Sequence, residues 1–125
     1  MKIVSTDTAP AAIGPYSQAI IHGNTVYCSG QISLTAEGAG PIGDTVEEQT
    51  VQVMKNIEAV LTAAGTKMSK VVKTTIFLTD MNDFAAVNKV YGDAFGDHRP
   101  ARSTVAVSAL PKGVKVEIEV LAALE

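Results

Sequence analysis

Four side chains that could take part in a reaction lie in strand-like parts of the sequence: Ser29, Arg102, Thr104 and Glu117. Arginine carries a planar fork of N–H donors that matches a carboxylate in bidentate fashion, a geometry that lysine does not reproduce. A glutamate carboxylate can orient a water molecule, and a hydroxyl group can donate or accept a hydrogen bond. These residue types suit the binding of a small molecule that carries a carboxylate and the addition of water to another part of that molecule.

The alternation of the strands predicts that these four side chains share one face of a sheet. Successive residues of a strand point to opposite faces, so the apolar series along three segments defines a core face beneath helices. That series consists of Val26, Cys28, Gly30, Ile32, Ser103, Val105, Val107, Ala109, Val114, Val116, Ile118 and Val120. Ser29, Arg102, Thr104 and Glu117 then point away from the helices.

Two interpretations of this polar face remain open. The usual role of the polar face of an antiparallel sheet is a solvated outer surface. Small residues such as Ala106 and Ser108, and Leu121 among the charged residues, instead favour a subunit interface that contains a few functional polar groups.

Two helices are predicted to support the sheet. Apolar residues recur at helical spacing from Asp44 or Thr45 to Ala64, Thr45 and Glu48 match a capping box, and Gly65 suits the C-terminal end. A second helix is predicted over Asp83 to Phe95, ended by Gly96. Its apolar stripe consists of Phe84, Val87, Tyr91, Ala94 and Phe95.

Six strand-like segments complete the pattern: Lys2 to Ser5, Tyr16 to His22, Thr25 to Ile32, Val71 to Leu78, Ser103 to Ala109 and Val114 to Ala122. Gly23-Asn24 predicts one tight hairpin, and Leu110 to Gly113 predicts a second, antiparallel hairpin between the last two strands. The apolar run Val71 to Leu78 predicts a central strand buried on both faces. The order ββαβαββ, with the possible first strand, predicts one α+β domain over residues 1–125. It has a six-stranded mixed sheet with two helices on one face.

Composition narrows the class of function. A length of 125 residues leaves no room for a separate cofactor domain, and the apolar runs are too short for a membrane span. One cysteine, Cys28, and two distant histidines, His22 and His98, argue against a disulfide or a metal site. A net charge of −3 with 5% aromatic residues argues against nucleic-acid binding. We therefore expect a small-molecule ligand and, because the N-terminus shows no secretory pattern, a cytoplasmic location.

Several segments together resemble one known family over nearly the whole length. They are Ala9 to Ala19, Ser29 to Ile32, Gln49 to Ile57, Asn82 to Asn88, Pro100 to Ser103 and Val116 to Glu119. In this order and spacing they are similar to the RidA (YjgF) family of enamine/imine deaminases. The resemblance implies a chorismate-mutase-like fold that assembles into a homotrimeric barrel with its sites between subunits.

The resemblance also implies an activity and a set of site residues. Family members of the archetypal type hydrolyse reactive enamines and imines of 2-amino acids, such as 2-iminopropanoate and 2-iminobutanoate, to 2-oxo acids and ammonia. This removes damaging metabolites without a cofactor. The arginine of the Pro-Ala-Arg-Ser motif binds the substrate carboxylate, and Arg102 occupies that position. The family's motifs further assign Tyr16, Ser29, Gly30, Asn88, the backbone at Thr104, and Glu117 to the site.

Three of these assignments have a simpler structural interpretation. Tyr16 could be a packed corner residue after Gly14-Pro15, Gly30 a strand bulge, and Asn88 an exposed helix position. Cys28 falls on the core face, so we expect a buried and inert thiol.

The chain departs from the family pattern at two positions. Thr104 stands where some members have cysteine, and Arg99 stands where an aromatic or apolar residue is common, which alters the rim of the site.

Three functions are compatible with these observations. The first is imine hydrolysis with catalytic roles for Arg102, Glu117, Tyr16 and Ser29. The second is a non-catalytic regulatory protein that binds small carboxylates, in which Glu117 is incidental. The third, RNA cleavage with translation inhibition, fits the acidic charge least.

The predicted hairpin leads to an expectation about the site. If Ala109 pairs with Val114, Arg102 lies four positions from Glu117, roughly 13 Å along the strand. We therefore expect Arg102 of one chain and Glu117 of another to serve one site.

Overall fold

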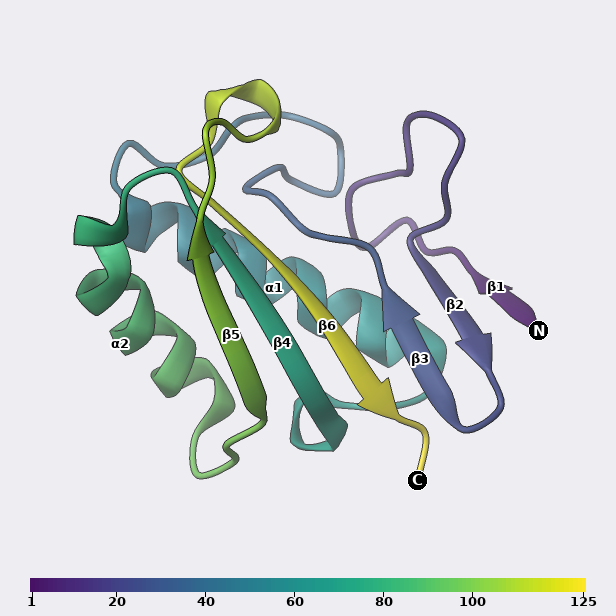
Figure 1. The fold of residues 1–125 in the computed structure, drawn as a ribbon. Helices are drawn as coiled ribbons and strands as arrows, with labels where there is room; N and C mark the ends of the chain where they lie inside the picture. The colour runs from purple at the N-terminus through teal and green to yellow at the C-terminus, as the bar shows by residue number, and fades with distance from the viewer.

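Two helices cover one face of a six-stranded sheet in the computed structural model, which describes residues 1–125 (Figure 1). The strands are β1 (Lys2–Val4), β2 (Ala19–His22), β3 (Thr25–Cys28), β4 (Val71–Leu78), β5 (Ala101–Ala106) and β6 (Val116–Ala123). The helices are α1 (Val46–Ala64) and α2 (Phe84–Phe95), with short 3-10 turns η1 (Met68–Lys70), η2 (Met81–Asp83) and η3 (Pro111–Gly113). The predicted α+β class, the mixed sheet and the placement of both helices on one face are confirmed.

Both helices begin and end where the sequence predicts. Thr45 caps α1 by accepting from the Glu48 backbone N–H, while the Glu48 side chain accepts from the Thr45 N–H, which completes the capping box. Gly65 ends the helix in the left-handed conformation at φ 88°. In α2 the stripe residues Val87, Tyr91 and Phe95 are buried and Phe84 is half-buried, but Ala94 is exposed, so its assignment to the stripe was wrong.

The strands of the N-terminal half are shorter than predicted, but their hairpin is confirmed. β2 begins at Ala19 rather than Tyr16, and β3 ends at Cys28 rather than Ile32. His22 pairs with Thr25 across the two-residue turn, in which Gly23 takes a φ of 61°.

The order of the strands contradicts the predicted C-terminal hairpin. The sheet runs β1-β2-β3-β6-β4-β5, so β6 lies between β3 and β4 and does not touch β5. β5 instead pairs in parallel with β4, because α2 carries the chain back over the sheet as a β-α-β crossover. The expected pairing of Ala109 with Val114 is therefore wrong.

The parallel register also reverses the predicted faces of β5. Arg102 pairs with Thr74 and Thr104 with Ile76, and both β4 residues point toward the helices and are fully buried. Arg102 and Thr104 consequently face α2, whereas Val105 is exposed on the other face. Arg102 and Thr104 were thus assigned to the wrong face, while Glu117 does lie on the open face, opposite Phe77 of β4.

A bulge at the end of β3 changes the faces there as well. Tyr27 pairs with Leu121, yet Gln31 pairs with Ile118, so four steps along β3 match three along β6. The extra residue shifts the alternation. Gln31, which the sequence placed on the polar face, is therefore buried at 6% exposure.

The core lies between the sheet and the helices. α1 contributes Val53, Ile57, Val60 and Leu61, which pack with Val26, Ile76, Leu78 and Ile118 of the sheet in one cluster. β4 is an interior strand, but the prediction that both its faces are buried is wrong, since Val72 is half exposed. Neither helix combines the length and hydrophobicity that a membrane span requires.

Candidate active site

One cavity gathers the predicted site residues Tyr16, Gly30 and Glu117. Its volume is about 420 Å³, and we call it the Glu117 cavity. It is lined by Pro10, Ala11, Ile13, Tyr16, Gln18, Gly30, Gln31, Ile32, Leu34, Pro111, Lys112 and Glu117. The lining residues come from the N-terminal segment, the loop after β3, η3 and the start of β6.

Glu117 is seated against Gly30. A Cβ atom placed on Gly30 would lie 2.1 Å from Glu117 Oε2 and 2.9 Å from Cδ, so only glycine leaves room for this carboxylate. Gly30 lies in the bulge that follows β3, as the simpler interpretation of this glycine predicted. The group that approaches its backbone is the Glu117 side chain. Burial raises the pKa of Glu117 above its usual range, and the negative charge of Glu119 raises it further. A raised pKa suits a carboxylate that exchanges protons during a reaction.

Buried amide side chains hold the walls of the Glu117 cavity. Gln18 accepts from the Thr6 N–H and donates to the carbonyls of Thr6 and Pro10, which fixes the segment before Tyr16. Asn56 of α1 donates to the carbonyls of Ile32 and Leu34 and fixes the loop after β3. The Gln49 to Ile57 motif thus acts through structure rather than through contact with a ligand.

Ser29 and Tyr16 differ in their surroundings. The Ser29 hydroxyl donates to the Ser17 carbonyl over 2.5 Å, which joins the two chain segments next to the cavity but leaves Ser29 outside its lining. Tyr16 is 55% exposed and lines the cavity, so the reading of a packed corner tyrosine is wrong.

A second cavity contains Arg102 and Asn88. It has a volume of about 460 Å³ and is lined by Asn88, Tyr91, Gly92, Arg99, Pro100 and Arg102; we call it the Arg102 cavity. Arg102 donates from Nη1 to Asn88 Oδ1 over 2.5 Å, and its guanidinium lies 5.0 Å from the Tyr91 ring centroid and 5.3 Å from that of Phe84. These contacts with α2 fix the guanidinium through cation–π attraction and one hydrogen bond. Asn88 is an exposed helix position, as its simpler interpretation proposed, but its side-chain oxygen also accepts a hydrogen bond from Arg102 and helps to orient it.

Thr104 lies beside Arg102 in a neighbouring hollow of about 430 Å³, lined by Met81, Phe84, Arg102 and Thr104. Its hydroxyl is buried and has no hydrogen-bond partner within the chain. Since buried polar groups are nearly always paired, this hydroxyl is free to bind a group from outside the chain.

The two cavities lie at separate places on one chain. Arg102 is level with Thr74 of β4 and hence with Val120 of β6, three residues from Glu117 along β6. With two strand spacings between β5 and β6, their Cα atoms are roughly 14 Å apart, and the side chains point to opposite faces. The predicted separation within one chain therefore holds, although the hairpin register from which it was argued is wrong.

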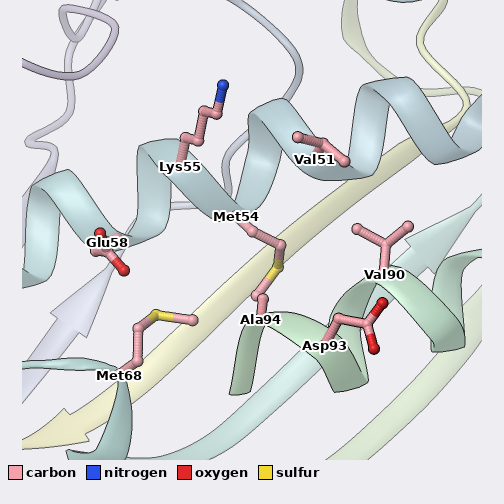
Figure 2. A pocket seen from close by; sticks show the side chains of 8 residues that line it. All are labelled: Val51, Met54, Lys55, Glu58, Met68, Val90, Asp93 and Ala94. Atoms are coloured by element: carbon pink, nitrogen blue, oxygen red, sulfur yellow. The ribbon is translucent and has the colours of Figure 1, made fainter. Parts of the chain in front are cut away.

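The groove between the helices, the single cysteine and the acidic and histidine side chains do not form a second candidate active site. A groove of about 380 Å³ runs between α1 and α2, where Met54, Met68 and Ala94 converge, and it contains none of the predicted site residues (Figure 2). Cys28 is half-buried rather than buried as predicted, and desolvation raises the pKa of its thiol to about 12, which keeps the thiol protonated and agrees with the predicted inertness. No group of three or more His, Cys, Asp or Glu side chains lies close enough together to hold a metal ion.

The sequence reasoning missed most of the residues that line the two cavities, among them Gln31, Lys112 and Tyr91. Gln31 reaches the Glu117 cavity because of the bulge, for which Gly30 is the only signal in the sequence. Lys112 lines the cavity from η3, in the turn that was predicted to be a simple hairpin loop. Tyr91 appeared only as a core residue, yet it also contacts Arg102 and shares a hydrogen bond of 2.7 Å with Thr74.

Comparison with known proteins agrees with the family resemblance of the sequence segments described above. A family model described as Endoribonuclease L-PSP matches residues 6–124. A protein of Arabidopsis thaliana named Reactive Intermediate Deaminase A, chloroplastic, is 50% identical over 98% of the chain and 66% of its own length. The chain belongs to this family, which includes the RidA proteins.

Other relatives of the RidA family match over almost their full length. A mouse protein named 2-iminobutanoate/2-iminopropanoate deaminase is 47% identical over 97% of the chain and 90% of its own length. The crystal structure of a Thermotoga maritima protein described as a putative endoribonuclease superposes with a TM-score of 0.96 at 50% identity. It covers 100% of this chain and 98% of the other.

Proposed function

We propose that this RidA family member hydrolyses the reactive imines and enamines of small 2-amino acids to 2-oxo acids and ammonia. Relatives at 47 to 50% identity are named as deaminases of such intermediates. This chain carries Arg102 and Glu117, the arginine and the glutamate that the family motifs assign to the site. The observation that carries the proposal is the presence of two complementary half-sites, a guanidinium held in place at Arg102 and a half-buried carboxylate of raised pKa at Glu117.

The reaction needs one water and a proton relay. Arg102 binds the substrate carboxylate, which holds the imine carbon in place. Glu117, as the carboxylate, accepts a proton from water while the water oxygen bonds to the imine carbon and the C=N electron pair moves to nitrogen; Glu117 then delivers that proton to the nitrogen, which gives the carbinolamine. In the second step Glu117 accepts the proton of the carbinolamine hydroxyl as the carbonyl of the 2-oxo acid forms, and it passes this proton to the nitrogen, which leaves as ammonia. In this proposal Tyr16 and the Thr104 hydroxyl serve these steps as hydrogen-bond donors, whereas Ser29, whose hydroxyl donates to the Ser17 carbonyl, holds the chain segments beside the cavity.

The separation of the half-sites supports a site shared between chains. A three- or four-carbon imine does not span roughly 14 Å and both faces of a sheet. A homotrimer in which one subunit presents Arg102, Asn88 and Thr104 to the Glu117 cavity of the next would complete three equal sites.

The test combines single variants with subunit mixing. Arg102→Ala should lower kcat/KM for 2-iminopropanoate about thirtyfold or more, because losing the charged partner of a desolvated carboxylate costs about 2 to 5 kcal/mol. Arg102→Lys, the matched control for charge, should recover only part of the rate. The imine is generated in the assay by threonine or serine dehydratase, and 2-oxo acid release is timed.

Subunit mixing then tests the shared site. Arg102→Ala and Glu117→Ala chains, dissociated and reassembled together, should form functional sites at about one quarter of positions, since each site draws one residue from each neighbour. Each variant reassembled alone serves as the control. Mixed oligomers that stay inactive would contradict the shared site, and an Arg102→Ala chain within a few-fold of wild type would contradict the role of Arg102.

The same assay separates the alternatives. A regulatory protein that only binds carboxylates would bind a 2-oxo acid without accelerating ammonia release. RNA cleavage, to which the name of the family model refers, would appear as salt-dependent RNA degradation that survives removal of contaminating nuclease. The cytoplasm remains our proposed location, and imaging of a tagged chain in its host tests it.

A further inference from the structure

Two arginines face the Arg102 cavity, and neither is paired with a carboxylate. Arg99 lies three residues before Arg102 and lines the same cavity of about 460 Å³, together with Asn88 and Tyr91. The only salt bridge of the chain joins Lys89 to Asp93, and no acidic residue lines this cavity. Two neighbouring guanidinium groups without a counter-charge form a strongly anion-attracting place.

Both guanidinium groups are held from one side and free on the other. Arg99 Nη1 donates to the carbonyls of Gly96 and His98, while Arg102 is held by Asn88 and the rings of α2. An arginine has five N–H donors, so each keeps donors for a ligand. Burial raises the pKa of Tyr91, while its hydrogen bond with Thr74 and then the charges of Arg102 and Arg99 lower it, so both arginines act on this hydroxyl.

We propose that Arg99 forms a second carboxylate subsite beside Arg102, so that this chain accepts imines of acidic amino acids. The ligands would be four- or five-carbon dicarboxylates such as 2-iminosuccinate and 2-iminoglutarate. The α-carboxylate binds Arg102 as in the proposed function, on which this inference rests, and the side-chain carboxylate binds Arg99.

The cavity favours a dianion over a single carboxylate. A three-carbon imine acid carries one carboxylate, which one bidentate arginine satisfies. The second arginine then stays unpaired unless the ligand brings another anionic group. A volume of about 460 Å³ lies within the range of cavities that enclose ligands larger than a three-carbon acid, so there is room for the longer substrate. Arg99 supplies the second guanidinium of the cavity, so a preference for a dianion depends on this residue.

The experiment measures two substrates on four proteins: the wild type, Arg99→Gln, Arg99→Lys and the control Lys67→Gln. Lys67 is exposed and lines none of these cavities, so its variant makes the same change of net charge elsewhere. An amino acid oxidase generates 2-iminopropanoate from alanine and 2-iminosuccinate from aspartate. Arg99→Gln should lower kcat/KM for 2-iminosuccinate ten- to a hundredfold and change that for 2-iminopropanoate less than threefold. Arg99→Lys should recover part of the loss, and Lys67→Gln should behave as wild type.

A binding measurement keeps this inference distinct from the proposed function. Calorimetry with the unreactive acids 2-oxoglutarate and 2-oxobutanoate should show tighter binding of the dicarboxylate, and Arg99→Gln should abolish the difference. If the wild type hydrolyses neither imine but shows this preference, the proposed function fails and the subsite stands. The subsite would be overturned if Arg99→Gln lowered the rates of both substrates equally, or lowered neither. It would also be overturned if the wild type hydrolysed 2-iminopropanoate but neither hydrolysed 2-iminosuccinate nor preferred the dicarboxylate. Thermal unfolding of each variant confirms that the fold is intact.

Discussion

Replacing Gly30 with alanine should disable Glu117 without unfolding the chain. The added Cβ would lie 2.1 Å from Glu117 Oε2, whereas ordinary contact begins at 3.4 Å, so the oxygen must retreat by about 1.3 Å. Displacement of a catalytic group by about 1 Å can cost roughly a hundredfold in rate. We therefore expect kcat/KM to fall about a hundredfold, mainly through kcat.

The effect on stability should be small. The Gly30 backbone does not adopt a positive φ, so alanine can take up the same conformation. The end of the Glu117 side chain is also a flexible obstacle. Reduced freedom of the unfolded chain offsets part of the crowding, and the free energy of unfolding should change by no more than about 1 kcal/mol. Urea unfolding measures this change.

A double-mutant cycle tests the reasoning. If Gly30 acts by seating Glu117, adding Gly30→Ala to the Glu117→Ala chain should leave its residual rate unchanged. Because the crowding is then gone, the free energy of unfolding should rise by up to about 1 kcal/mol through the reduced freedom of the unfolded chain. A rise in KM at constant kcat in Gly30→Ala would refute the mechanism, because it would mean that the backbone at Gly30 contacts the substrate directly. An unchanged rate would refute the importance of this contact altogether.

Two further predictions concern proton exchange and metals. Since burial and then Glu119 raise the pKa of Glu117, activity should be lost as the pH falls through a value above the usual carboxyl range. Glu119→Gln should move that limb of the pH–rate profile to lower pH, and an unmoved limb would exclude the Glu119 contribution. Dialysis against EDTA should leave the rate unchanged; a loss that zinc restores would contradict a site built only from protein side chains.

The helices could be predicted from the sequence because their signals are local. Spacing of apolar residues, the Thr45–Glu48 capping box and the glycines at positions 65 and 96 specify both helices without knowledge of the rest of the chain. Strand partners are not local. The turn residues from Leu110 to Gly113 suggested a hairpin. However, β6 lies between β3 and β4, where its apolar side chains Val116, Ile118 and Val120 are fully buried.

The faces of β5 were mispredicted for a related reason. β5 is an edge strand of this chain, and its apolar Val105 is exposed while Arg102 lies beneath α2. Alternation assigns the apolar residues to the core, but the aromatic rings of α2 provide a surface on which an arginine packs favourably. The grouping of Glu117 with Gly30 depended on a bulge that alternation does not reveal, and only the family motif pointed to it.

The position of β6 also governs how the chain can fold. β1 to β3 form one antiparallel unit and β4 and β5 form a parallel pair, and β6, which follows all of them in sequence, is the only strand that hydrogen-bonds to both. The ribosome synthesises β6 after β1 to β5, so the two parts of the sheet remain separate, with their edges exposed, until β6 has been released. Closure requires contacts between residues distant in sequence, which slows folding and exposes the unpaired edges of β3 and β4 to other chains. A nascent chain arrested before β6 is therefore the form in which this protein is most vulnerable to aggregation and most in need of a chaperone.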